Sequence, residues 1–216
     1  MDYQGVKLEH FAHDGFRISA NNKVIYIDPF SLKDDQIAHA DYVLLTHEHF
    51  DHTSQADIKK IIDKETVILA PSECQEQLKP LKVKEIMYVY PNQTIDLGEI
   101  KVETVPAYNL NKFRNEGVPY HPKEDDKVGY IIELNGVRIY HAGDTDNIPE
   151  MSNLTKIDLA LLPVSGTYVM DWQEAVEAVK SIKPKIAIPM HYGHLIGSQN
   201  DAEKFKAAAD CRVEII

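Results

Sequence analysis

Three histidines and an aspartate lie within six residues in the segment Thr46-His47-Glu48-His49-Phe50-Asp51-His52. Imidazole nitrogens and a carboxylate oxygen are the donors that a borderline-soft divalent cation prefers. The segment follows directly on the apolar run Tyr42-Val43-Leu44-Leu45, so the donors begin where a buried strand is expected to end. A solvent-exposed, histidine-rich turn is the alternative, since the chain holds ten histidines. The position straight after a strand favours a metal site.

Short apolar runs rich in Val, Ile, Leu and Tyr predict the strands that position such a site. They occur at residues 16–19, 23–27, 42–46, 66–69, 101–105, 129–134, 137–140, 159–163 and 186–189. The pairs Asn21-Asn22 and Asn135-Gly136 each separate two runs, and these residue types tolerate the positive φ of a tight turn. We therefore expect β-hairpins at 16–27 and 129–140.

Amphipathic spacing predicts three helices. Thr53-Ser54 caps the first, and Asp171 with Glu174 has the capping-box spacing of a second that stops before Pro184. A third begins near Asn200-Asp201. Hairpins early in the chain and strand-helix-strand units later predict a mixed sheet, or two sheets, flanked by helices.

Composition narrows the class of protein. A chain of 216 residues with 44% hydrophobic content can bury one core, which predicts a single domain over 1–216. The formal charge of -11 would repel a polyanion and argues against nucleic acid as a partner. No signal-peptide or membrane-spanning pattern is present, so we expect a cytoplasmic protein that does not engage a membrane. Cys74 and Cys211 are expected to be plain thiols. Self-association into a homo-oligomer is also compatible with the sequence.

The donor segment also resembles a known signature. His47-x-His49-x-Asp51-His52 is similar to the metal-binding motif of the metallo-β-lactamase superfamily. Asp28-Pro29-Phe30, Tyr140-His141-Ala142-Gly143-Asp144-Thr145 and Pro189-Met190-His191-Tyr192 resemble further motifs of that superfamily in the same order. The resemblance covers nearly the whole chain and is greatest to the subgroup that includes ascorbate-phosphate lactonase and related small hydrolases.

The resemblance implies an α+β fold, a four-layer αββα sandwich with one or two metals at one edge of the sheets. It implies that the ligands are His47 and His49 for the first metal, Asp51, His52 and His191 for the second, and Asp144 as a bridge. Zn²⁺ is the default for these donors, which also accommodate Mn²⁺, Fe²⁺ or Ni²⁺.

A site of this kind would hydrolyse a small ester, lactone, amide or phosphodiester with a metal-bound hydroxide, because a metal lowers the pKa of bound water to about 7. Asp51 is the candidate catalytic residue, since it could also orient that hydroxide. Residues 107–127 predict a long polar loop, a lid or a disordered segment, whose basic side chains could hold a phosphorylated substrate. These are Lys112, Arg114, Lys123 and Lys127.

The same residues are compatible with functions other than hydrolysis. One is a non-catalytic or single-metal member that binds a metabolite or a protein partner. Another is a nuclease-type phosphodiesterase. A redox site of the flavodiiron kind is disfavoured, because His49 stands where those proteins have a glutamate and no flavin domain is evident.

The chain departs from the superfamily at one expected ligand. A histidine usually follows the strand that corresponds to residues 102–106, but here Ala107-Tyr108 precedes Asn109, whose amide is a poor zinc ligand. His121, flanked by Pro119 and Pro122, is a candidate replacement, while Asn109 itself or water is the alternative. His13 could contact substrate or support the metal ligands, or it could be an ordinary loop histidine.

Overall fold

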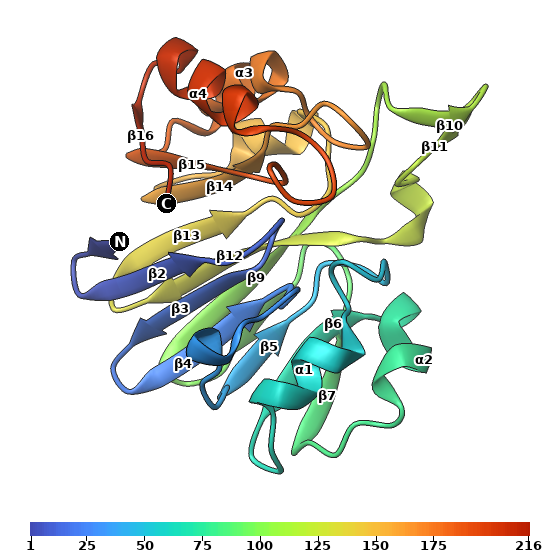
Figure 1. The fold of residues 1–216 in the computed structure, drawn as a ribbon, viewed down its shortest axis with the longest axis vertical. Coiled ribbons are helices and arrows are strands. Elements are labelled where there is room, and N and C mark those ends of the chain that lie inside the picture. Colours follow the sequence, from blue (N-terminus) through green and yellow to red (C-terminus); the bar gives the residue numbers. More distant parts are fainter. The chain divides into compact units, whose positions relative to one another are not determined.

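The computed structural model describes residues 1–216, which divide into two compact units, Met1–Tyr90 and Pro91–Ile216. Each unit is built around a seven-stranded mixed sheet (Figure 1). Of the predicted alternatives, a mixed sheet or two sheets flanked by helices, the second is confirmed. The assignment of the whole chain to a single domain stays a prediction. No helix combines the length and the apolar character needed to cross a membrane.

The sheet of unit 1 runs in sequential order from β1 to β7. Strands β1 to β4 pair antiparallel, and β4 to β7 pair parallel. The strands are β1 (Asp2–Tyr3), β2 (Val6–His10), β3 (Phe16–Ala20), β4 (Lys23–Ile27), β5 (Tyr42–Leu44), β6 (Val67–Pro71) and β7 (Glu85–Val89). The helices are η1 (Asp34–Gln36), α1 (Gln55–Ile61), η2 (Ser72–Cys74) and α2 (Gln75–Leu78).

The core of unit 1 packs α1 against one face of the parallel strands. Ile58 and Ile61 of α1 join Val43 and Ile68 of β5 and β6 in one buried cluster. Ser54 caps α1, because its side chain accepts a hydrogen bond from the backbone N–H of Asp57. The cap fixes where the donor segment ends and the helix begins.

The sheet of unit 2 has the order β16-β15-β14-β13-β12-β9-β8. β13, β14, β15 and β16 pair parallel, and β8, β9, β12 and β13 pair antiparallel. Helix α3 contacts β14, and α4 contacts β15 and β16 (Figure 1). The strands are β8 (Thr94–Asp96), β9 (Ile100–Pro106), β12 (Val128–Leu134), β13 (Val137–His141), β14 (Leu159–Pro163), β15 (Ile186–Met190) and β16 (Arg212–Val213), with a separate hairpin of β10 (Phe113–Asn115) and β11 (Val118–Pro119). The helices are η3 (Lys123–Asp125), η4 (Pro149–Asn153), α3 (Trp172–Ile182) and α4 (Gln199–Ala208).

Both predicted hairpins are confirmed. Asn21 and Asn22 join β3 to β4 with φ of 51° and 60°, and Asn135 and Gly136 join β12 to β13 with φ of 54° and 74°. Positive φ at both turn positions matches the right-handed twist of the paired strands. The capping box predicted at Asp171 and Glu174 is also present at the start of α3.

Of the two alternatives for residues 107–127, a lid or a disordered segment, the disordered one is wrong. This stretch contains β10, β11 and η3, and its backbone bonds to neighbouring segments of unit 2. Several short elements were not predicted, because strands of two or three residues carry too few positions for a period to show. They include β1, β8 and β16. Cys74 and Cys211 are both thiols outside any disulfide, as expected.

Candidate functional site

The candidate donors of each unit follow the carboxyl ends of its parallel strands. In unit 1, Asp28 follows β4 and His47 lies shortly after β5. In unit 2, Asp144 lies shortly after β13, and His191 directly follows β15. Loops at this edge of a parallel sheet are where α/β proteins usually place ligands.

Asp28 organises the donor segment of unit 1. Its carboxylate accepts hydrogen bonds from the backbone N–H of Thr46 (2.8 Å) and from the Thr46 hydroxyl (2.6 Å). It also lies 2.8 Å from Nδ1 of His52. An ionised carboxylate only accepts, so Nδ1 of His52 carries the proton and Nε2 keeps its lone pair.

The Thr46 hydroxyl, itself bonded to Asp28, orients His47. Because the Thr46 hydroxyl donates to Asp28, it can accept from Nδ1 of His47, which lies 3.0 Å away. Nε2 of His47 then lies 2.9 Å from Nδ1 of His49. The two nitrogens are at hydrogen-bond distance, and the ring centroids of His47 and His49 lie 4.6 Å apart.

His13 lies beside Asp51 and His52 rather than at a remote loop. Its Nε2 lies 3.1 Å from the Asp51 carboxylate, and its ring centroid is 5.7 Å from that of His52. Asp14, next to His13, also has a carboxylate oxygen within 4.8 Å of a ring nitrogen of His52. Sequence reasoning missed Asp14, although an acid beside a histidine in a short loop was the signal.

The central carboxylate of unit 2 is that of Asp144. Its Oδ2 lies 3.4 Å from Nε2 of His191 and 3.4 Å from Nε2 of His121. Nδ1 of His191 lies 2.9 Å from the hydroxyl of Ser165, which follows β14. The predicted Asp144 and His191 are therefore brought together, and His121 joins them.

Asn109 lies behind His121. Its amide oxygen lies 3.0 Å from Nδ1 of His121, and its amide nitrogen donates to Asp146 at 3.1 Å. Asp146 also accepts from the backbone N–H groups of Leu110 (2.6 Å) and Asn111 (2.8 Å). Sequence reasoning missed Asp146, whose signal was a second aspartate two residues after Asp144.

The lysines of the segment 107–127 are held by carboxylates. Lys112 pairs with Glu174 at 2.7 Å, Lys123 with Glu150 at 2.8 Å, and Lys127 lies 3.6 Å from Asp125. Such pairing offsets the positive charge that a phosphate would need. Arg114 donates to the backbone carbonyl of Tyr120 over 3.4 Å.

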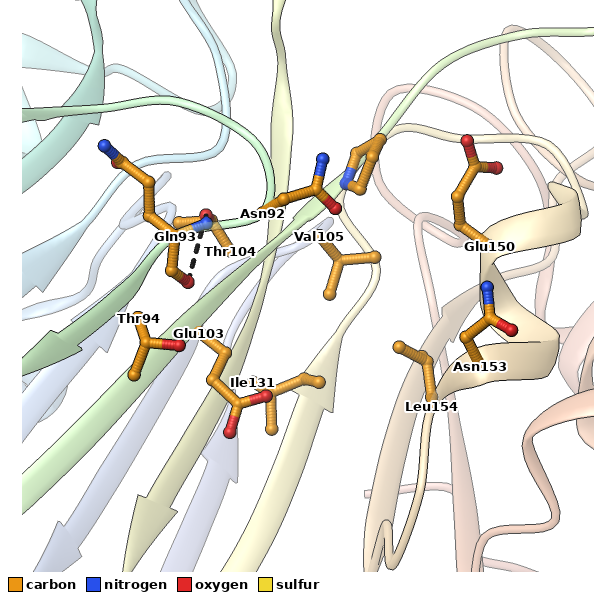
Figure 2. Close-up of a pocket in the computed structure, with 11 residues that line it drawn as sticks. Asn92, Gln93, Thr94, Glu103, Thr104, Val105, Ile131, Glu150, Asn153 and Leu154 are labelled. Atoms are coloured by element: carbon orange, nitrogen blue, oxygen red, sulfur yellow. Dashed lines mark hydrogen bonds between the residues drawn. The ribbon is translucent and has the colours of Figure 1, made fainter.

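One cavity of about 280 Å³ lies in unit 2 away from these donors. Figure 2 shows that it lies between the strand residues Thr94, Glu103 and Ile131 and the η4 residues Glu150 and Asn153. None of the candidate metal ligands lines it. Its size alone therefore does not select it as the functional site.

An exposed aromatic ring belongs to the donor segment of unit 1. Phe50, between His49 and Asp51, is 69% exposed. Its ring packs edge-on to that of Phe30, with centroids 6.0 Å apart. Both line a shallow depression of about 380 Å³ with Glu48. An apolar surface thus adjoins the candidate ligands.

Left-handed backbone occurs at three candidate positions. His13, Asp28 and His191 have φ of 57°, 44° and 59°. This conformation costs of order 1–3 kcal/mol at a non-glycine residue and persists where surrounding structure enforces it. Such strain clusters at functional sites, so it accords with a role for all three side chains. The distribution of donors between a first and a second metal stays a prediction.

Known proteins resemble this chain over nearly its full length. A family model described as "Beta-lactamase superfamily domain" matches residues 7–191. A UPF0173 metal-dependent hydrolase of Nanoarchaeum equitans is 35% identical over 208 residues, which is 95% of this chain and 92% of the relative. A UPF0173 metal-dependent hydrolase of Archaeoglobus fulgidus is 32% identical over 234 residues, covering 98% and 95%.

A solved structure agrees with these sequence matches. A protein from Parabacteroides distasonis, described as a metal-dependent hydrolase, superposes with a TM-score of 0.84 at 32% identity, covering 97% of this chain and 92% of that one. The predicted α+β class is confirmed by these matches and by the two mixed sheets. The chain therefore belongs to the β-lactamase superfamily domain family, among the UPF0173 metal-dependent hydrolases.

Proposed function

We propose that this protein is a metal-dependent hydrolase that cleaves a small ester, lactone, amide or phosphodiester. The observation that carries the proposal is the common arrangement of its buried imidazoles. In His47, His52 and His191, Nδ1 has an oxygen partner at 2.8–3.0 Å, and Nε2 is the nitrogen left to bind a cation. Metal-ligating histidines are held in this way in many proteins.

The donor set fits a divalent metal. We assign as ligands the residues of the sequence motifs: His47, His49, Asp51, His52, Asp144 and His191. Neutral imidazoles and carboxylates together suit Zn²⁺, which we propose as the natural ion, and they also suit Mn²⁺, Fe²⁺ or Ni²⁺. When bound, such an ion supplies a nucleophile from water at neutral pH and polarises the scissile carbonyl or phosphoryl group.

The side chains of the protein would then orient the reactants. Asp51 Oδ2 lies 3.1 Å from Nε2 of His13 and 3.9 Å from Nε2 of His52. A carboxylate in this position can accept a proton from the attacking water, and His13 can hold Asp51 in place. We therefore propose Asp51 as the catalytic residue and His13 as its positioning residue.

The substrate is proposed from the surroundings of the donors. The exposed Phe50 offers an apolar contact within the donor segment, and Lys112, Lys123 and Lys127 are already paired with carboxylates. Both observations favour a small substrate with an apolar group over one recognised through a phosphate by these lysines. The cytoplasmic location and the lack of a nucleic-acid partner stay predictions.

The test is elemental analysis of the purified protein, followed by assays with metal-free protein to which each ion is restored in turn. The assay panel contains aryl and alkyl esters, lactones, amides and phosphodiesters. Turnover that depends on metal for at least one class is expected. Tight metal binding without turnover of any class would instead favour a non-catalytic member that binds a metabolite.

A further inference from the structure

Hydrogen bonds fix the orientation of the Asn109 side-chain amide. Its amide nitrogen donates to Asp146 Oδ1 at 3.1 Å and to the backbone carbonyl of Tyr168 at 2.8 Å. Both partners only accept, so the amide nitrogen must lie on this side. The amide oxygen consequently faces His121 and accepts from its backbone N–H at 2.8 Å.

This orientation fixes the proton on the His121 ring. The same amide oxygen lies 3.0 Å from Nδ1 of His121. An amide oxygen cannot donate, so Nδ1 must carry a proton, and Nε2 of the neutral ring keeps its lone pair. Asn109 thus sets the tautomer of His121, as Asp28 sets that of His52. The Ser165 hydroxyl donates to the backbone carbonyl of Thr167 at 3.5 Å and can therefore accept from Nδ1 of His191 in the same way.

The lone pair of His121 faces Asp144. Nε2 of His121 and Nε2 of His191 each lie 3.4 Å from the same oxygen, Asp144 Oδ2. This is longer than the 2.7–3.2 Å typical of an N–H···O hydrogen bond. It matches the separation of about 3.4 Å between two tetrahedral ligands that bind zinc at about 2.0–2.2 Å. His121 and His191 are thus placed equivalently about one carboxylate.

The segment that carries Asn109 is anchored to the Asp144 turn. The backbone N–H of Tyr108 lies 3.2 Å from the Thr145 hydroxyl, and its carbonyl accepts from the N–H of Asp146 at 3.0 Å. His121 is 1% exposed and Asp144 is 4% exposed. Burying a polar ring costs free energy unless it is hydrogen-bonded, and a ring already held in place loses less entropy on binding a ligand.

We propose that His121 is a metal ligand that replaces the histidine expected at position 109, and that Asn109 is its positioning residue. The inference rests on the proposed metal-dependent function. It places the metal ligand at His121, 12 positions after the position where the superfamily has a histidine. Asn109, the residue at that earlier position, is the hydrogen-bond partner of the ligand.

The experiment measures zinc binding by the full-length protein. Elemental analysis gives the number of zinc ions per chain, and competition with a chromophoric chelator gives each Kd. The variants are His121→Ala, Asn109→Ala and the double variant. His191→Ala serves as a positive control, because it has the same distance to Asp144, and His39→Ala as a control at an exposed histidine. A thermal unfolding curve of each metal-free variant shows whether that variant is folded.

His121→Ala should bind one zinc fewer than the parent, or bind it at least about 100-fold more weakly, which is the upper end of the loss caused by removing a partner of a ligand. Asn109→Ala should weaken the same zinc about 10–100-fold. The double variant should bind zinc no more weakly than His121→Ala does, because Asn109 acts through His121. Melting temperatures without metal should change less than those with zinc.

Unchanged zinc number and Kd in folded His121→Ala would overturn the assignment and show that His121 only pairs with Asp144. Additive losses in the double variant would overturn the positioning role of Asn109. A parent protein that binds no divalent metal would contradict the proposed function itself, so the two failures are distinguishable.

Discussion

The Asp28 carboxylate lies 2.8 Å from Nδ1 of His52, and both side chains are fully buried. The same carboxylate accepts from the backbone and the hydroxyl of Thr46. One anion therefore sets the tautomer of His52 and, through the Thr46 hydroxyl, that of His47. Asp28 prepares the lone pairs of two histidines without being one of the proposed ligands.

Asp28→Asn should weaken zinc binding about 10–100-fold, because an amide has a single acceptor oxygen and cannot accept all three bonds that the carboxylate accepts from the Thr46 N–H, the Thr46 hydroxyl and His52. We also expect a loss of about 1–3 kcal/mol in the free energy of unfolding, since the site is buried. The zinc Kd comes from chelator competition on protein shown to be folded by circular dichroism. Asp35→Asn, at an exposed carboxylate, is the control. An unaltered Kd in the folded variant would remove Asp28 from the metal site.

Asp144→Asn should lower turnover at least about 100-fold, equivalent to about 2.7 kcal/mol of transition-state stabilisation. The change keeps the shape of the side chain but removes the negative charge that compensates bound cations. Metal content and turnover are measured against the parent and against the exposed-site variant Asp210→Asn. Full activity with a full complement of metal would contradict this role.

Metal removal should lower the melting temperature by about 5–10 °C without unfolding the protein at 25 °C. Zinc at 100 times its Kd stabilises the folded state by about 2.7 kcal/mol, and 1 kcal/mol shifts the melting temperature of a protein of this size by about 2–4 °C. Thermal scans with and without a strong chelator measure the shift. Complete loss of structure on chelation would show that the metal is needed for folding.

Phe50→Ala should raise KM for substrates with apolar groups several-fold while leaving metal content unchanged. The ring is exposed between His49 and Asp51 and rests against Phe30, so it is available for contact. Removing most of an aromatic side chain from such a partly exposed contact forfeits about 1 kcal/mol of apolar burial, which corresponds to about a five-fold change in binding. Phe113→Ala, at another exposed phenylalanine, is the matched control. Equal effects of both variants would argue against a specific contact.

Asp57→Asn should lower the free energy of unfolding by about 1–3 kcal/mol at pH 7. Burial raises the pKa of Asp57, but hydrogen bonds from Lys60, Ser54, Leu32 and Ser31 outweigh it and lower the pKa below its ordinary value of 3.8. A lowered folded-state pKa stabilises the protein above the unfolded-state pKa, and this contribution is lost as pH falls through the folded value.

Urea unfolding of the parent and of Asp57→Asn at pH 7, 5, 3 and 2 measures that dependence. The difference between the two proteins should be constant at pH 7 and 5 and should shrink below about pH 4. A difference that stays the same down to pH 2 would show that the charge of Asp57 contributes nothing.

The sequence by itself determined most of the local structure. The hairpin at Asn21-Asn22 and the capping box at Asp171 are decided by residues close together in the chain, because positive φ and cap geometry are local properties. The donor segment from His47 to His52 was also evident from the sequence, since its histidines and its aspartate lie close together in the chain. Short strands such as β8 and β16 escaped prediction, because their pairing supplies the stability that their few residues lack.

Only the tertiary structure decided which nitrogen of each histidine ring has an oxygen partner and which carboxylates lie beside those rings. Asp28 lies 24 positions from His52, and Asn109 lies 12 positions from His121, so neither pairing follows from any local period. The sequence could name His121 as a replacement ligand but could not decide between it and the alternatives, Asn109 itself or water. Its burial beside Asp144, with Asn109 behind it, follows from hydrogen bonds that fold residues 108–111 onto 145–146, because backbone groups removed from water must find partners.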